Sequence, residues 1–201
     1  GGLAFHDGRL YVPVSSLEEG TAVIASYPCC TFRGSVVSLD AATGRQIWKT
    51  HTIAAEPRRT TTSRVGTQLW GPSGGAVWSA PTLDPTRNRL YVTTGDSYSN
   101  PPAPESDAVM ALAMDTGRRL WVRQTLPGDA WNVGCLERAS KGDVNCPESA
   151  GPDYDFGSSP ALATLPGGQT IVLAGQKSGM LYGLNPETGA VETQPVDERA
   201  P

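Results

Sequence analysis

Three predicted loops of this chain carry carboxylates at places where they could act together. Glu18 and Glu19 follow an early strand, Asp96 follows a Thr-Gly pair, and Asp153 and Asp155 flank a tyrosine. Oxygen ligands of this kind suit a hard cation. The alternative is that each acid forms a turn or a cap, as Asp and Glu commonly do at strand ends. That alternative explains any one of these acids taken singly, whereas the three loops together could converge on a hard cation.

Trp78 and Lys177 add chemistry that a cation site alone does not need. Trp78 follows a pair of glycines, whose small size would let a flat ligand approach the backbone and stack on the indole. Lys177 offers a single positive charge at the end of a predicted strand. Packing between sheets is the structural alternative for Trp78. It suits Trp48 and Trp121 better, because those two residues occupy matching positions of a repeat.

The four cysteines form two pairs by position. Cys135 and Cys146 bound a polar loop of ten residues. A disulfide is favoured there, because zinc would need further ligands and the two histidines of the chain lack metal-ligand spacing. Cys29 and Cys30 are adjacent and can bond only through a strained eight-membered ring, so the sequence leaves their state open. Four cysteines favour an oxidising compartment, and we expect a periplasmic or secreted protein.

A repeated motif organises these loops. Each copy has a short apolar strand, a turn that ends in Thr-Gly, and a closing position four residues after the glycine. Gly44, Gly117 and Gly189 lie 73 and 72 residues apart, and the closing residue is tryptophan in two copies and Thr193 in the third. A fixed period with turn signals between short strands predicts propeller blades or solenoid turns.

The composition indicates an all-β protein. The 201 residues include 23 glycines and 17 prolines, and no stretch of twelve keeps a helical apolar stripe free of both. We expect residues 1–201 to form β-propeller blades, with repeats at roughly 1–50, 75–124 and 155–194 and a loop insertion at 127–152. Closed propellers have about 4–8 blades. Three repeats therefore predict a partial propeller that needs the remaining blades of a longer protein.

The charge balance argues against two kinds of partner. The formal net charge is −4 and the isoelectric point is near 5.2. No nucleic-acid partner is expected, because no basic stripe is present to neutralise phosphates. No run of eighteen apolar residues occurs, so the sequence predicts no membrane span.

The Asp-x-x-Thr-Gly-x-x-x-Trp form of the repeat resembles the tryptophan-docking motif of the eight-bladed pyrroloquinoline quinone (PQQ) dehydrogenases. Within that family the chain is most similar to the polyvinyl alcohol dehydrogenase branch. The stretches that carry this similarity are residues 14–19, 29–37, 129–132, 145–147 and 151–157. The resemblance implies that the chain is an internal part of an eight-bladed quinoprotein.

The resemblance also implies a metal site. Glu19 falls where the family places its calcium-binding glutamate, and Glu18 is a near alternative. Asp96 takes the place of the family's metal-binding asparagine, and Asp155 would be an extra metal ligand.

For the cofactor, the resemblance makes Trp78 the floor on which the quinone stacks and Lys177 the cation that reaches its reactive carbonyl. Vicinal cysteines cover the quinone in this family, which would give Cys29 and Cys30, with the nearby Arg33, a cofactor-binding role. The pair departs from the family in position, because it lies beside the expected metal glutamate rather than in an earlier blade.

The catalytic base has two candidates. Family members often carry Trp-Asp at this position, whereas Trp131 is followed here by Asn132. The resemblance therefore implies Asp153 as the base, across the cysteine-bounded insertion, or Asp129 in its place.

The function implied by the resemblance is calcium-assisted oxidation of an alcohol by PQQ. Electrons would pass to a cytochrome c or to a haem domain elsewhere, because this chain has no Cys-x-x-Cys-His motif. Two alternatives are a non-catalytic propeller module that serves as an interaction scaffold, and a truncated, inactive fragment.

Overall fold

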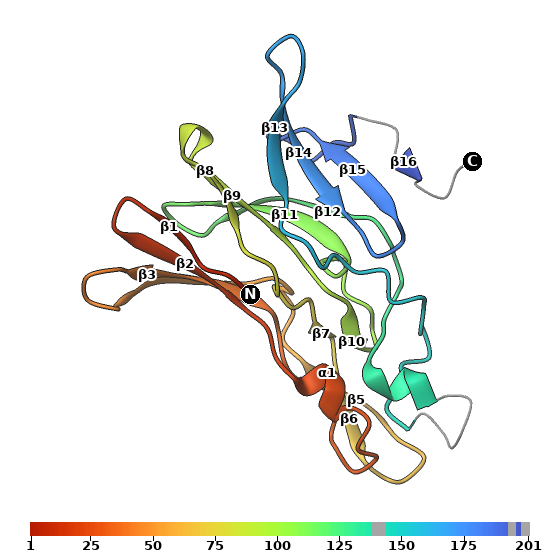
Figure 1. Cartoon of the computed structure of the whole chain (residues 1–201). Coiled ribbons are helices and arrows are strands. Elements are labelled where there is room, and N and C mark those ends of the chain that lie inside the picture. Colours follow the sequence, from red (N-terminus) through yellow and green to blue (C-terminus); the bar gives the residue numbers. More distant parts are fainter. Residues whose placement is uncertain (138–143, 193–195, 198–201) are drawn as a thin grey trace.

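The chain folds mainly as three four-stranded antiparallel sheets that lie side by side (Figure 1). The computed structural model describes residues 1–137, 144–192 and 196–197. Blade 1 consists of β1 (Ala4–His6), β2 (Arg9–Val14), β3 (Ser35–Asp40) and β4 (Gln46–His51). Blade 2 consists of β8 (Thr82–Asp84), β9 (Arg89–Thr93), β11 (Ala108–Ala113) and β12 (Arg119–Gln124). Blade 3 consists of β13 (Ala161–Thr164), β14 (Thr170–Gly175), β15 (Met180–Leu184) and β16 (Val196–Asp197).

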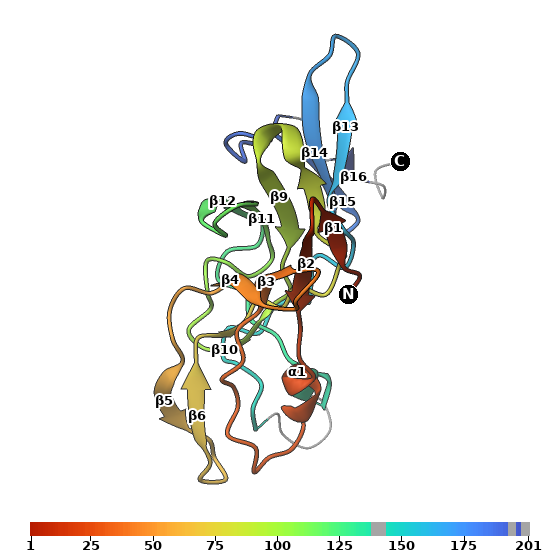
Figure 2. The same cartoon turned by 90° about the vertical axis from the view of Figure 1, so that its left-hand side faces the viewer.

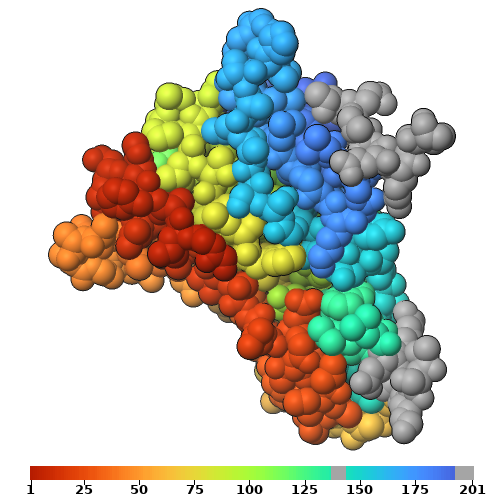
Figure 3. All heavy atoms as spheres, in the orientation of Figure 1, coloured from red at the N-terminus to blue at the C-terminus, as the bar shows by residue number. Residues whose placement is uncertain are grey.

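In each blade the strands pair in chain order, so each is a meander of hairpins. The strand β11 is buried along its whole length, as expected for a central strand that is covered on both faces. The space-filling view shows blade 2 in yellow and green between blade 1 in red and orange and blade 3 in blue (Figure 3). The all-β blade architecture predicted from the sequence is confirmed.

Shorter elements lie at one end of the blades. They are the hairpin β5 (Arg58–Thr62) and β6 (Gln68–Gly71), the pair β7 (Ser73–Gly74) and β10 (Ser97–Ser99), and the helices α1 (Glu18–Thr21) and η2 (Val133–Glu137). The short helix η1 (Pro85–Arg87) instead lies in the turn between β8 and β9. Figures 1 and 2 both place α1, β5 and β6 at the end opposite the tip of the β13–β14 hairpin. None of the helices in the described residues is long and apolar enough to cross a membrane.

Each joint between blades is made by the tryptophan of one repeat and the turn of the next. The Trp48 indole N–H donates to the carbonyl of Met114 at 3.1 Å, and that of Trp121 donates to the carbonyl of Pro186 at 3.1 Å. Both carbonyls stand three residues before the glycine of a Thr-Gly turn. A Cβ at that glycine, Gly117 in the first joint, would meet the Trp48 ring at 2.5 Å. The glycine is therefore required because the ring lies against its backbone.

Further side chains repeat from joint to joint. The hydroxyl of Tyr11 donates to the same carbonyl as Trp48, and that of Tyr91 to the same carbonyl as Trp121. Arginines two residues before these tyrosines add hydrogen bonds to the same turns. Two apolar clusters fill the joints, one between blades 1 and 2 and one between blades 2 and 3. The repeat seen in the sequence is therefore a repeat of interfaces, not only of strands.

Candidate functional site

A cavity of about 260 Å³ opens where loops of all three blades meet. Its lining comes from the segment after β2, the β7–β8 and β9–β10 connections, the segment before β13 and the β14–β15 turn. The lining residues are Ser15, Ser16, Glu19, Ala76, Trp78, Gly95, Asp96, Tyr98, Asp155 and Lys177. Five residues that the sequence predicted for a cation and cofactor site, Glu19, Trp78, Asp96, Asp155 and Lys177, are thus brought together.

The helix α1 separates the roles of its two glutamates. Glu18 is buried, and its carboxylate accepts hydrogen bonds from the Tyr27 hydroxyl at 2.8 Å and from the backbone amides of Thr31 at 2.9 Å and Phe32 at 2.7 Å. Successive helical residues point about 100° apart, and Glu19 lines the cavity instead. The geometry therefore favours Glu19 as the ligand, because Glu18 already anchors the loop that follows.

Trp78 is fixed at both edges while part of its surface stays open. Its indole N–H donates to Asp155 Oδ2 at 3.1 Å, and the side chain is 39% exposed. Two glycines make room for it. A Cβ at Gly95 would come within 3.0 Å of Asp155 Oδ2, and a Cβ at Gly157 would come within 2.9 Å of the Trp78 ring. The indole is a positioned aromatic surface on which a flat ring can stack.

Lys177 is the cation of this cavity. Its Nζ lies 2.6 Å from Asp153 Oδ1, 2.6 Å from Asp155 Oδ1 and 5.4 Å from the centroid of the Trp78 ring. Burial lowers the pKa of Lys177, but the hydrogen bonds and charges of Asp153 and Asp155 outweigh it and raise the pKa above its ordinary value. The lysine is therefore held as an ammonium between the two carboxylates.

The cavity region holds more carboxylates than the single ammonium group of Lys177 can neutralise. Asp96, Asp153 and Asp155 each place an oxygen within 4.8 Å of the others. Burial raises the pKa of Asp96, and the neighbouring carboxylates raise it further. Burial and the charges of Asp155 and Asp153 raise the pKa of Glu19 from 4.5 to about 7. These acids repel one another, and an added cation would relieve that repulsion.

The donor set fits a hard cation. Asp96 is 2% exposed, and its Oδ1 has no hydrogen-bond partner. Oxygens that surround a calcium ion at about 2.3–2.6 Å lie no more than about 5 Å apart, which agrees with the 4.8 Å limit of the cluster. Oxygens of Asp96, Asp153 and Asp155 therefore lie close enough together to hold calcium, and Glu19 lines the same cavity.

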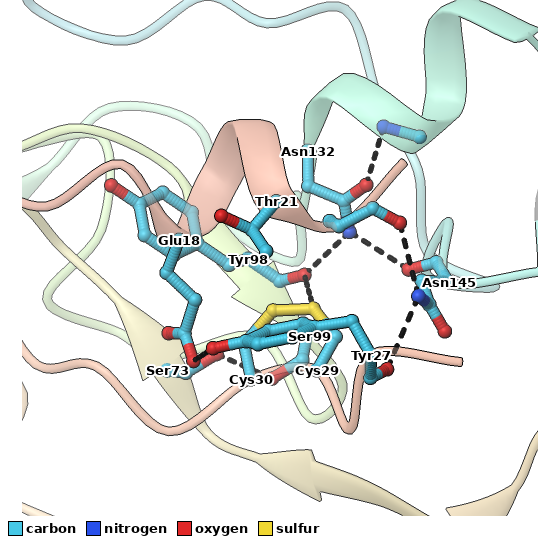
Figure 4. The surroundings of a disulfide bond; sticks show 12 residues. Glu18, Thr21, Tyr27, Cys29, Cys30, Ser73, Tyr98, Ser99, Asn132 and Asn145 are labelled. Atoms are coloured by element: carbon cyan, nitrogen blue, oxygen red, sulfur yellow. Dashed lines mark hydrogen bonds between the residues drawn. A yellow bond between two sulfur atoms is a disulfide. The ribbon is translucent and has the colours of Figure 1, made fainter. Parts of the chain in front are cut away.

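The vicinal cysteines lie next to this cavity but do not line it. The structure links Cys29 to Cys30 and, as predicted, Cys135 to Cys146. Cys29 and Cys30 are buried and pack in one apolar cluster with Ala76 and Tyr98, which do line the cavity; Figure 4 shows Tyr98 beside the disulfide. The structure therefore does not bring this pair into contact with the cavity, and its predicted cofactor contact stays a prediction.

Arg33 also points elsewhere. Its guanidinium donates to the carbonyls of Ile53 and Ala54 and lies 3.7 Å from a carboxylate oxygen of Glu56.

Asn132, which follows Trp131, is buried and donates to the carbonyls of Tyr98 and Asn145 (Figure 4). Asn132 therefore fixes the insertion loop. The proton acceptor that the resemblance implies must be another residue.

The second base candidate, Asp129, lies in a different cluster. One oxygen each of Asp96, Asp107 and Asp129 lies within 4.8 Å of the others, and all three residues are buried. The sequence reasoning missed Asp107. The only signal was an acid placed directly before the apolar strand β11, where a turn former is equally expected.

The comparisons with known proteins agree with this fold. Residues 19–143 match the family described as glucose/ethanol/alcohol dehydrogenase, beta-propeller domain, which is abbreviated PQQ. The chain belongs to this PQQ dehydrogenase β-propeller family.

Two relatives are polyvinylalcohol dehydrogenases. The protein of Pseudomonas sp is 43% identical over 187 residues, and that of Sphingopyxis sp. (strain 113P3) is 45% identical over 186 residues. These alignments cover 93% and 92% of this chain, which spans only 28% of either relative. The quinohemoprotein alcohol dehydrogenase from Comamonas testosteroni has the same fold, with a TM-score of 0.61 and 19% identity over 97% of this chain and 28% of that one.

Proposed function

We propose that this chain contributes the quinone and cation site of a PQQ-dependent alcohol dehydrogenase of the polyvinyl alcohol type. The observation that carries the proposal is the cavity itself, where an open indole, a fixed lysine and carboxylates from three blades meet. A propeller that served only as a scaffold would not need buried acids without partners around an exposed tryptophan. The identity of more than 40% to two polyvinylalcohol dehydrogenases supports the substrate class.

The residues take separate roles in this proposal. Trp78 supplies the stacking surface, and Glu19, Asp96 and Asp155 supply the oxygen ligands of calcium. When bound, PQQ supplies the two-electron acceptor and calcium the Lewis acid that polarises its carbonyl oxygen. Lys177 orients Asp155 and adds a positive charge beside the ring.

Asp153 is the proton acceptor that we propose for the alcohol hydroxyl. Its side chain is 29% exposed, whereas Asp129 is 4% exposed and faces a glycine backbone. Lys177 Nζ lies 2.6 Å from Asp153 Oδ1 and holds this carboxylate in place, and a carboxylate can accept a proton. Neither acid is among the residues that line the cavity, but Asp153 is paired with Lys177, which does line it.

Partners and location follow from the same proposal. A haem domain or a cytochrome c would accept the electrons, as the name quinohemoprotein indicates for a structural relative. Two disulfides within the described residues support a periplasmic or secreted location.

The test is a titration of PQQ, in the presence of calcium, into the complete protein that contains these blades. Absorbance follows the bound quinone, and a dye-linked assay with polyvinyl alcohol and secondary alcohols follows turnover. We expect Trp78→Ala to weaken quinone binding by about two- to tenfold from the loss of stacking alone, since stacking contributes about 0.5–1.5 kcal/mol beyond the area it buries.

Trp70→Ala is the matched control, because Trp70 packs under Arg59 on the β5–β6 hairpin and does not line the cavity. It should bind the quinone like wild type. Equal binding by wild type and Trp78→Ala, or no binding at all by the complete protein, would overturn the proposal.

A further inference from the structure

The acids Asp96, Asp107 and Asp129 form a second cluster, here called the inner acid cluster. Asp96 belongs both to it and to the acids of the cavity, whereas Asp107 and Asp129 do not line the cavity. All three come from blade 2 and the segment that follows it: Asp96 from the β9–β10 connection, Asp107 from the residue before β11, and Asp129 from the loop after β12. The inner acid cluster therefore needs only one blade for its ligands.

The inner acid cluster is almost completely withdrawn from solvent. The exposed fractions are 2% for Asp96, 0% for Asp107 and 4% for Asp129. The Asp107 amide donates to the carbonyl of Gly95 at 3.1 Å, and the Asp107 carbonyl accepts from the Thr125 amide at 3.0 Å. The backbone is thereby tied on both sides, which fixes the carboxylate close to Asp96.

The carboxylate oxygens of the cluster lack donors, which is an observation separate from their closeness. Asp96 Oδ1 and both oxygens of Asp107 and Asp129 have no hydrogen-bond partner. Within the described residues no lysine or arginine forms an ion pair with any of the three. Burying an ionised carboxylate without a partner is strongly unfavourable, so the cluster requires a compensating positive charge or bound protons.

A cation satisfies these oxygens better than protons do. Each proton would supply one donor to one acid, whereas a calcium ion accepts six to eight oxygens at about 2.3–2.6 Å. One oxygen from each of the three side chains lies within 4.8 Å of the others, and five oxygens of these side chains have no hydrogen-bond partner. Burial raises the pKa of Asp107, and the Asp129 charge adds to the rise.

We propose that Asp96, Asp107 and Asp129 bind a second cation of the calcium class, behind the cation of the cavity and bridged to it by Asp96. The site has the opposite character to the cavity, because it has no lysine, no aromatic surface and no access for a substrate. Its role would be to neutralise the acids behind Asp96 and so hold the Asp96 side chain in place.

The test counts calcium ions in the complete protein, stripped with a chelator, dialysed against calcium without PQQ, and measured by elemental analysis. We expect Asp107→Asn combined with Asp129→Asn to lose one calcium per chain relative to wild type. Glu148→Gln, an exposed acid of the same insertion, is the matched control and should lose none. An unchanged count in the double variant would overturn the proposal.

A second variant separates this proposal from the proposed function. Glu19→Gln removes a ligand of the cavity alone, so it should abolish calcium-dependent quinone binding while the inner calcium remains. If quinone binding failed altogether but the double variant still lost one calcium, the inner site would stand and the proposed function would not.

Crystals of the unmodified protein grown with calcium or a lanthanide give a direct measurement if the double variant does not fold. An anomalous peak within about 2.3–2.6 Å of Asp107 and Asp129 oxygens is expected. A map with an ion beside Asp155 and none beside Asp107 would contradict the proposal.

Discussion

The joints between blades and the cavity both use tryptophan, but they use it in opposite ways. Trp48 is 8% exposed and donates its N–H to a backbone carbonyl of the next blade, whereas Trp78 is 39% exposed and donates to the Asp155 carboxylate. The joint tryptophans recur with the period of the repeat, and Trp78 falls outside it. In this chain, position relative to the repeat therefore separates tryptophans that hold the blades together from one that offers a surface to a ligand.

The comparison predicts its largest effect on stability at the joints. Trp48→Ala should destabilise the complete protein by about 3–5 kcal/mol, because a large buried side chain and its hydrogen bond are lost together. Trp78→Ala should cost only about 1 kcal/mol, for its one hydrogen bond. Thermal unfolding of the two variants measures the contrast. Equal losses in both would show that Trp78 is also a packing residue.

Glycine variants probe the same joint from the other side. Gly117→Ala would place a Cβ 2.5 Å from Trp48, at a backbone φ of +70°, and should cost about 2–3 kcal/mol through strain and displacement of the ring. Gly44→Ala is the matched control, since its φ is +72° but no atom lies within 4 Å of the added Cβ. It should cost only about 1 kcal/mol. Similar denaturation midpoints for the two variants would show that the contact with the Trp48 ring is not the reason why glycine is needed at position 117.

The neighbouring glutamates of α1 allow a finer test of the comparison. Glu18→Gln should destabilise the protein by about 1–3 kcal/mol, because its carboxylate accepts from two backbone amides and a tyrosine hydroxyl. Its effect on calcium affinity should be small. Glu19→Gln should do the reverse and weaken calcium binding with little change in unfolding temperature. Isothermal titration with calcium and thermal unfolding of both variants measure the two effects. Weaker calcium binding in Glu18→Gln and a lower unfolding temperature in Glu19→Gln would show that the roles are the reverse of those assigned.

The smallest expected effect is on pH dependence. Since the pKa of Glu19 is raised to about 7, a proton competes with calcium below that pH, and the affinity should fall by up to about tenfold per pH unit from this group. The stability of the calcium-free protein has the opposite pH dependence. Between pH 4.5 and 7 the folded state keeps a proton that the unfolded state has released, so stability falls as the pH rises through that window. Calcium titrations at several pH values should show a shallower slope in Glu19→Gln.

The fold could be predicted from the sequence because the repeat encodes local geometry. The Thr-Gly turns, the apolar strands and the closing tryptophans recur at a fixed period, and each of these signals acts over a few neighbouring residues. Glu19, Asp96, Trp78 and Lys177 could be selected for the cavity because they interrupt that pattern at the ends of strands.

Other parts of the site could not be read from the sequence. The choice between Glu18 and Glu19 depends on which one the Thr31 amide reaches, and that contact joins segments a dozen residues apart. Asp107 becomes notable only when its burial beside Asp96 and Asp129 is known, since its sequence context is that of an ordinary turn. Loop packing likewise decides that Cys29 faces Tyr98 rather than the cavity.

The indole of Trp78 also provides a fluorescent reporter inside the cavity. Its N–H is bonded to a carboxylate, its ring lies near an ammonium group, and part of its surface is in contact with solvent. Emission from an indole in such surroundings responds to the charges beside it and to any ring that stacks on it. The difference in emission between the wild-type protein and Trp78→Phe would therefore report ligand binding by quenching, without the need for turnover.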